Sequence, residues 1–303
     1  MGKFIKKIIL FLMPIFIFCI IAEILLRGIP NDYKIKAEYL EKNSSEIEVL
    51  VLGNSQSFYG IIPELFDLTC YNSAYNGQSL DIDYLILNKH IDKISELKYL
   101  IIPISYLSLY YNMFQNKNGY MLKYNIYSKL DIPNGLFYSS EILNNSLSDN
   151  LEKLFNYYHL GIYDNITSPT GFIKNMPDFP EWKKKELATD IVKGRNKKNK
   201  MECFEYNIKI LENIIKLLES KNVKIIFFTP PVPENYYNGV LISQYELMEK
   251  TLNQFAELYQ NCIYINLFKS DNFGYDDFYD GQHLNSSGAE KLTKKIIEIM
   301  NLL

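Results

Sequence analysis

The sequence has little net charge, few cysteines and few histidines. A formal net charge of -3 and a sequence pI near 5.8 give no electrostatic reason to expect nucleic acid as a partner, and no nucleic-acid motif is recognisable. Of the four cysteines, Cys19 lies in an apolar run, so an odd number remains outside it and no disulfide framework is predicted. No motif proposes a metal or a nucleotide, and we expect no cofactor.

One long apolar run, Ile8 to Leu26, contains a single charged residue, Glu23. At a rise of ~1.5 Å per residue, this run has about the length of the hydrocarbon core of a bilayer. We therefore predict a membrane span in an N-terminal anchor, residues 1–27. A cleaved signal peptide is the alternative, but no small-x-small cleavage site follows the run, and Cys19 comes after the bulky Phe18, unlike a lipoprotein site.

Lysines at the N-terminus favour an N-terminus in the cytoplasm and an exported remainder. The asymmetry is small, because basic residues also follow the apolar run: Arg27, Lys34, Lys36 and Lys42. Residues 28–46 are polar and are predicted to be a stalk. The remaining residues, 47–303, are predicted to be one domain that carries an insertion at 106–202.

Apolar runs of strand length alternate with helical patterns on both sides of this insertion. The predicted strands are 49–52, 69–74, 99–104, 224–228 and 262–267. The apolar faces of the predicted helices lie at 80–94, 204–218, 245–259 and 289–299. Ser79 is a candidate N-cap, and two serine–glutamate pairs have capping-box spacing, Ser243 with Glu246 and Ser287 with Glu290. This alternation predicts an α/β fold with a parallel five-stranded sheet covered on both faces.

The insertion does not follow this rhythm and is predicted to be mostly irregular or helical. Its segment 182–200 reads "WKKKELATDIVKGRNKKNK". Residues 183–200 contain eight Lys or Arg against Glu186 and Asp190. Such a charge can attract anionic lipid head groups or a polyanionic glycan, although a solvated loop explains it as well.

The first predicted strand ends in the sequence "GNSQS", at the sheet edge where open α/β proteins place their active sites. Gly53 permits a tight turn, and Ser55 can begin the next helix with its hydroxyl exposed. Backbone N–H groups at this helix start are candidates to face a developing oxyanion. We therefore interpret Ser55 as a candidate nucleophile.

A serine nucleophile needs a base, and the chain has three histidines. His90 is expected to face solvent or the C-terminus of its helix, and His159 is expected to pack among aromatic rings. His283 lies after the last predicted strand, at the same sheet edge as Ser55. Asp280 precedes it by three residues, a spacing that brings the carboxylate to the imidazole in a tight loop. The alternative is that Asp280 and Gly281 only form a surface turn.

These motifs together make the chain resemble the SGNH (GDSL-like) hydrolases, over residues 47–105 and 203–303. "GNSQS" is similar to the family's Gly-Asp-Ser block, with Asn54 in place of Asp, and "DGQH" is similar to its Asp-x-x-His block. The resemblance implies a flavodoxin-like three-layer sandwich with Ser55 as nucleophile, His283 as general base and Asp280 as orienting acid. An α/β-hydrolase elbow fits poorly, because position 57 is Ser57 instead of glycine.

The resemblance also proposes residues around the nucleophile. "NSAYNGQS", 72–79, is similar to the family's second block, which implies a backbone oxyanion donor at Gly77. The third block, Gly-x-Asn-Asp, is replaced by "PISYLS", 103–108, so Asn76 or Ser105 is expected to compensate for the absent asparagine, or the protein is a slow or specialised member. Three further residues complete the candidate site: Ser57 as fallback nucleophile, and Thr229 and Pro230 in the loop after the fourth strand, where a simple prolyl turn is the alternative.

A membrane anchor on such a domain is similar to bacterial cell-envelope acyl-transfer proteins of this superfamily. The resemblance implies a single-pass membrane protein whose exported domain acts on envelope polysaccharide through an acyl-serine intermediate, as an esterase or an O-acyltransferase. Its partners would be an acyl donor, a carbohydrate acceptor and a multispanning membrane acyltransferase. A non-catalytic SGNH-like protein that binds glycan or assists assembly is the alternative.

Overall fold

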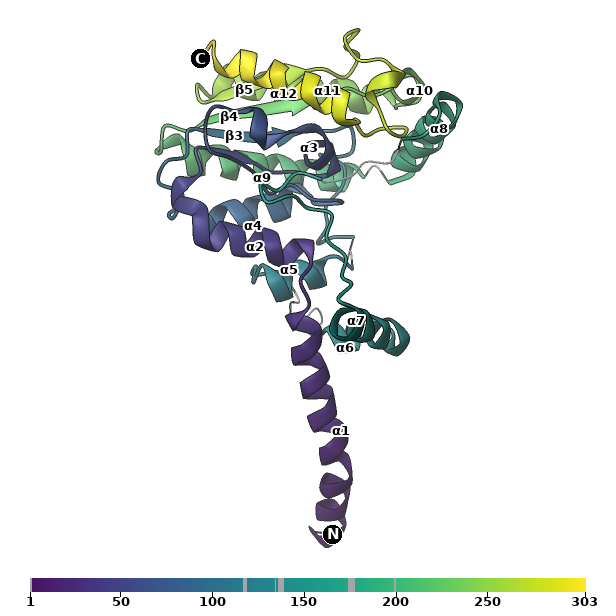
Figure 1. Ribbon diagram of the computed structural model, residues 1–303. Helices are drawn as coiled ribbons and strands as arrows, with labels where there is room; N and C mark the ends of the chain where they lie inside the picture. The colour runs from purple at the N-terminus through teal and green to yellow at the C-terminus, as the bar shows by residue number, and fades with distance from the viewer. Residues whose placement is uncertain (1, 117–118, 134, 136–138, 174–177, 199) are drawn as a thin grey trace. The chain divides into compact units, whose positions relative to one another are not determined.

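In the computed structural model, five apolar segments form one all-parallel sheet (Figure 1). The strands are β1 Val49–Val51, β2 Cys70–Asn72, β3 Tyr99–Pro103, β4 Lys224–Thr229 and β5 Cys262–Asn266. Their order in the sheet is β2-β1-β3-β4-β5, which is the flavodoxin-like order. The predicted α/β class, the five strands and the parallel pairing are confirmed.

Every residue of β1 and β2 is buried, and because successive side chains of a strand point to opposite faces, both faces of the sheet are covered there. Val49, Val51 and Ile101 belong to one buried cluster with Leu292 and Ile296 of the last helix. The helices α3 (Ser55–Gly60) and α12 (Ser286–Met300) contact each other, as do α4 (Leu80–His90) and α9 (Met201–Glu219). Figure 1 shows the first pair on one side of the sheet and the second pair on the other. This is the three-layer arrangement that the alternation of strands and helices predicts.

The chain divides into two compact units, and the structure describes residues 2–116, 119–133, 135, 139–173, 178–198 and 200–303. One unit comprises Met1–Tyr39 and Asn118–Asn165, and the other comprises Leu40–Lys117 and Ile166–Leu303. The second unit contains the sheet. The predicted insertion, 106–202, contributes to both units, and its residues 117–118, 134, 136–138, 174–177 and 199 lie outside the described residues.

The sheet-containing unit has three further helices, α8 Glu181–Lys198, α10 Glu234–Tyr237 and α11 Ile242–Leu258, and three short 3-10 helices, η1 Ser44–Glu46, η2 Pro63–Leu65 and η4 Tyr275–Asp277. Both predicted capping boxes are wrong. Leu241 is the N-cap of α11, without a side-chain hydrogen bond, and Asn285 is the N-cap of α12, where its side chain accepts a hydrogen bond from the N–H of Gly288. The last helix therefore begins two residues earlier than a capping box on Ser287 and Glu290 would place it.

His90 is the last residue of α4 and is buried, not solvent-exposed. Burial lowers the pKa of its imidazole to about 4, because the charged form loses hydration. A neutral, enclosed ring at this position packs in the fold and does not meet a substrate.

The first unit begins with α1, Gly2–Gly28, and contains α5 Met121–Tyr127, α6 Glu141–Asn144 and α7 Leu147–Leu160. The segment Phe4–Gly28 of α1 has a mean hydropathy of 2.9. The residues of its most apolar stretch are not buried against other parts of the protein. This helix is long and apolar enough to cross a membrane, although a signal sequence meets the same criteria. The predicted stalk contains a helix, α2 Asp32–Asn43, with buried residues including Tyr33, Ala37 and Leu40.

Candidate active site

The turn that follows β1 requires glycine at position 53. Gly53 has a φ of 109°, and a Cβ there would lie 2.3 Å from Cδ of Pro103. A side chain is excluded both by the backbone conformation and by the close approach of β3. Its N–H donates to Oδ1 of Asp83 at 2.8 Å, which holds the turn against α4. The chain can therefore turn sharply from β1 into α3.

Asn54 and Ser55 start α3. Asn54 is the N-cap, and its Oδ1 accepts a hydrogen bond from the N–H of Gln56 at 2.9 Å. Its Nδ2 donates to Oγ of Ser105 at 3.3 Å. Ser55 is the first helical residue and is only partly buried. The N-cap thus fixes the backbone that carries Ser55, and Ser105, two residues after β3, supports the N-cap.

Ser55, His283 and Asp280 form a continuous line of hydrogen bonds. Oγ of Ser55 lies 2.8 Å from Nε2 of His283, and Oδ2 of Asp280 lies 2.8 Å from Nδ1 of the same ring. A carboxylate beside Nδ1 holds the proton on that nitrogen, which leaves the lone pair of Nε2 facing the serine hydroxyl. The structure therefore brings Ser55 together with Asp280 and His283, which lie more than 220 positions further along the sequence.

Asp280 is held by its own loop. Its Oδ1 accepts backbone hydrogen bonds from Gln282 and His283, both at 2.8 Å. Burial by itself raises the pKa of Asp280, but the hydrogen bonds and the charge of His283, together with the two backbone bonds, lower it below its ordinary value. The carboxylate therefore stays ionised beside the ring.

Two tyrosines fix the plane of the imidazole. The ring of Tyr279 stacks on His283 with an interplanar angle of 11° and a centroid distance of 5.5 Å. Tyr59 of α3 stacks on the same ring at 4.7 Å. These contacts restrict rotation of the imidazole, so that both of its nitrogens keep their partners. The loop sequence "DFYDGQH" already contained Tyr279, but a tyrosine beside a histidine in sequence does not predict stacking.

Gln282 and Arg195 are two further polar residues at the site that sequence reasoning missed. Nε2 of Gln282 lies 3.1 Å from Nε2 of His283, so it shares this nitrogen with Ser55. Oε1 of Gln282 accepts a hydrogen bond of 3.4 Å from Arg195 of α8. Arg195 belongs to the basic segment 182–200. The resemblance gave that segment no counterpart, so nothing in the sequence connected it with the site.

The other predicted site residues lie in different surroundings. Asn76 and Gly77 lie in the turn after β2, where Gly77 is exposed and has a φ of 72°. Ser57 is fully buried, and its hydroxyl has no hydrogen-bond partner among the described residues. Thr229 is fully buried at the end of β4 and bonds the Tyr264 hydroxyl at 2.8 Å, and Pro230 is also buried. The side chains of Ser57 and Thr229 thus lie in the interior.

Comparisons with known proteins give no family membership. No protein-family model matches the chain, and no curated protein matches it. Among solved structures, a protein from Streptococcus pneumonia provisionally described as a platelet activating factor matches with a TM-score of 0.42 at 13% identity, over 96% of this chain and 98% of that one. A Bacteroides fragilis protein provisionally described as an acylhydrolase matches with a TM-score of 0.44 at 11% identity, over 87% and 94%. Likenesses this distant assign no activity, so the functional argument rests on the site itself.

Proposed function

We propose that this protein is a membrane-anchored serine esterase or O-acyltransferase of the SGNH type, which works through an acyl-Ser55 intermediate. One observation carries the proposal, namely the unbroken hydrogen-bonded line from Asp280 through His283 to the Ser55 hydroxyl. A serine hydroxyl is hardly ionised near neutral pH, and a neighbouring imidazole backed by a carboxylate is the usual means of activating it.

In the proposed reaction, Oγ of Ser55 attacks the carbonyl carbon of an acyl ester while Nε2 of His283 takes the hydroxyl proton. The tetrahedral intermediate collapses, the bond to the alcohol oxygen breaks, and His283 returns the proton to the leaving alcohol. Water or a sugar hydroxyl then attacks acyl-Ser55 by the same proton route. Attack by water gives hydrolysis, and attack by a sugar hydroxyl gives acyl transfer.

The tetrahedral intermediate needs hydrogen-bond donors for its oxyanion. The N–H of Ser55 is the first of α3 and has no acceptor within its own helix. The backbone of Gly77 is the second proposed donor. The SGNH asparagine that would supply a third is absent after β3, and loss of such a donor typically costs ~3 to 4 kcal/mol of transition-state stabilisation. We therefore expect slow turnover of simple esters.

The anchoring part of the proposal rests on α1. A helix long and apolar enough to span a bilayer would hold the catalytic unit at a membrane, on its extracytoplasmic side. By resemblance to envelope acyl-transfer proteins, the acceptor would be a hydroxyl of cell-envelope polysaccharide. The donor would be an acyl group delivered by a multispanning membrane acyltransferase.

Covalent labelling tests the catalytic claim. The full chain in detergent is treated with a fluorophosphonate, and with p-nitrophenyl acetate to follow an acetyl-enzyme burst. We expect an adduct on Ser55 and, in Ser55→Ala, no adduct and a loss of turnover of roughly 10⁴-fold or more. Ser57→Ala is the matched control, since it removes an unpartnered hydroxyl two residues along the same helix. An unmodified Ser55, or unchanged turnover in Ser55→Ala, would remove the catalytic claim.

A second candidate is a non-catalytic protein of the same fold that holds glycan for a partner enzyme. The absent third-block asparagine favours it, because in the segment after β3 it is Ser105 that accepts a hydrogen bond from Asn54. The two candidates differ in the labelling experiment. A binding protein would retain glycan affinity in Ser55→Ala and would show no burst.

A further inference from the structure

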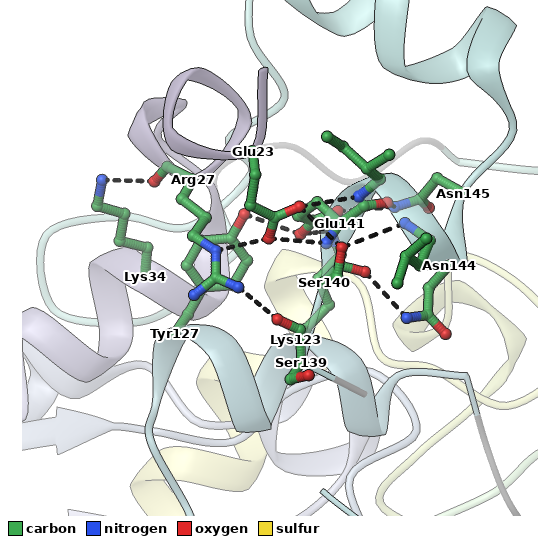
Figure 2. A network of polar contacts seen from close by, with 12 residues as sticks. Glu23, Arg27, Lys34, Lys123, Tyr127, Ser139, Ser140, Glu141, Asn144 and Asn145 are labelled. Carbon is green, nitrogen blue, oxygen red and sulfur yellow. Dashed lines mark hydrogen bonds and ion pairs between the residues drawn. The ribbon is translucent and has the colours of Figure 1, made fainter. Parts of the chain in front are cut away.

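Two helices of the first unit, α6 and α7, contact the C-terminal end of α1, and Figure 2 shows the polar contacts around α6. The carboxylate of Glu23, in α1, accepts hydrogen bonds from the N–H groups of Glu141 at 3.0 Å and Ile142 at 3.1 Å, and from Oγ of Ser140 at 2.9 Å. Nε of Arg27 donates to the same carboxylate at 2.6 Å, and its guanidinium also donates to the carbonyl of Ser139. The carboxylate of Glu23, a residue of the apolar helix α1, thus caps the N-terminus of α6.

Further polar contacts complete this junction. Glu141 is buried and accepts hydrogen bonds from Nζ of Lys123 at 2.6 Å and from the hydroxyl of Tyr127 at 2.8 Å. The hydroxyl of Tyr158, in α7, donates to the carbonyl of Leu25 at 3.0 Å. Nζ of Lys34 donates to the carbonyl of Arg27 at 3.1 Å, at the end of α1. The polar groups here are paired within the protein, which is what a position beside hydrocarbon requires.

One face of α7 is apolar and exposed. We call this surface the α7 apolar face. It consists of Leu147, Leu151, Phe155 and Tyr158, whose exposed fractions are 70%, 50%, 56% and 52% in that order. Their spacings of four, four and three place them on one stripe of the helix. Asp149, Lys153 and Asn156 lie on the opposite side, and Glu152 borders the apolar face. Asn150 and Tyr157 lie between these faces, and Asn150 is buried.

The apolar surface of α1 continues to this junction. Ile24 is 64% exposed and Leu25 is 37% exposed, directly beside the residues that hold α6 and α7. In Figure 1, α7 runs across the direction of α1 and lies beside its C-terminal end. A helix that crosses the end of a membrane span lies along the membrane surface, and its apolar stripe then reaches the acyl chains.

We propose that α7 is an interfacial helix, whose apolar face (Leu147, Leu151, Phe155 and Tyr158) inserts among the lipids at the end of the α1 span. The inference rests on the proposed anchoring by α1. The α7 apolar face contacts the lipid bilayer, because this face is continuous with the exposed apolar surface of α1. The polar network at the junction also holds α7 at the end of the α1 span. Tyrosine, as at position 158, favours the membrane–water boundary, and phenylalanine, as at position 155, is common on the apolar face of interfacial helices.

Depth-dependent fluorescence quenching in vesicles tests this proposal on the full chain. Trp182 is the only tryptophan of the sequence, so Trp182→Phe gives a background without indole signal. Three variants in this background each place one tryptophan, Leu151→Trp on the α7 apolar face, Asp149→Trp on the opposite side, and Phe11→Trp within the span. Phosphatidylcholine brominated near the headgroup end of its acyl chains, or at the chain centre, is the quencher.

We expect shallow bromines to quench Leu151→Trp roughly twofold or more, with a blue-shifted emission, and to leave Asp149→Trp almost unchanged. Phe155→Trp repeats the measurement one turn further along. Quenching of Phe11→Trp by chain-centre bromines, without quenching of Leu151→Trp or Phe155→Trp, would overturn this inference and leave the anchoring intact. A blue shift at 151 without quenching would mean that protein covers the face, which also overturns it. An unquenched Phe11→Trp would contradict the anchoring itself.

Discussion

Two carboxylates in different units of the molecule, Asp280 and Glu23, have almost the same surroundings and different consequences. Each carboxylate accepts hydrogen bonds from two backbone N–H groups, and each also contacts a side chain that carries nitrogen. Asp280 contacts an imidazole, whose second nitrogen has a lone pair that can accept a proton, whereas Glu23 contacts the guanidinium of Arg27, which has no acceptor atom. The first arrangement can move a proton, and the second can only fasten helices together (Figure 2).

A third carboxylate, that of Asp83, accepts a backbone hydrogen bond but contacts no basic side chain among the described residues. It accepts the N–H of Gly53 at 2.8 Å and the amide of Gln78 at 2.6 Å. Burial raises the pKa of Asp83 to about 7, since no positive charge compensates for the lost hydration and Asp81 adds a like charge. Whether a buried carboxylate in this chain is ionised therefore depends on what kind of side chain it meets.

We expect Asp280→Asn to have the largest effect of the three substitutions, because it disturbs the hydrogen-bonded line from Asp280 through His283 to Ser55. The amide oxygen keeps the backbone hydrogen bonds of the loop, but the NH₂ group meets Nδ1 and favours the wrong tautomer of His283. We expect turnover of p-nitrophenyl acetate to fall roughly 10⁴-fold while the circular dichroism spectrum is unchanged. Asp276→Asn, an exposed acid in the preceding turn, is the matched control. Retained turnover in Asp280→Asn together with loss in Asp276→Asn would identify Asp276 as the orienting acid.

Asp83→Asn tests the carboxylate without a cation. Its folded-state pKa lies above the unfolded value, so the folded state binds the extra proton, and the free energy of unfolding falls as the pH rises toward and through about 7. We expect the unfolding free energy of the unmodified chain in urea to be lower at pH 8 than at pH 5, by at most about 3 kcal/mol. This difference should shrink in Asp83→Asn, and an equal pH dependence in both proteins would contradict the assignment.

Glu23→Gln tests the fastening role and has the smallest effect. The amide retains one acceptor oxygen for the α6 N–H groups but loses the charge that attracts Arg27. A loss of about 1 to 2 kcal/mol corresponds to hydrogen exchange roughly 5 to 30 times faster at the amides of Glu141 and Ile142. Ester turnover by the sheet-containing unit should not change. Unchanged exchange at these amides would mean that packing alone holds α6.

The strands and the candidate triad were the parts of this protein most open to prediction. A parallel sheet buried on both faces needs continuous apolar runs, so the segments at Val49, Tyr99 and Lys224 were visible without coordinates. Helix starts were less predictable. Asn285 caps α12 in place of the expected serine, because either polar residue can accept an N–H hydrogen bond, and the path of the preceding loop decides which one does.

The junction around Glu23 lay beyond sequence reasoning. In the sequence, Glu23 is only a charged residue near one end of an apolar run, and Glu141 lies in a segment without a periodic pattern. Their connection depends on contacts between residues 118 positions apart, for which neither local propensity nor spacing provides a signal. The same applies to Arg195, which reaches the site through Gln282.

The order of apolar and polar residues by itself determined the parallel five-stranded sheet, the apolar α1 and the sheet edge that carries Ser55 and His283. These follow from periodicity, because burying a strand or one side of a helix imposes a repeat on the chain. Only the tertiary structure decided that Nε2 of His283 faces the Ser55 hydroxyl, that two tyrosines stack on this imidazole, and that Glu23 closes α6. Such contacts join residues distant in sequence, and their geometry is set by how whole elements pack.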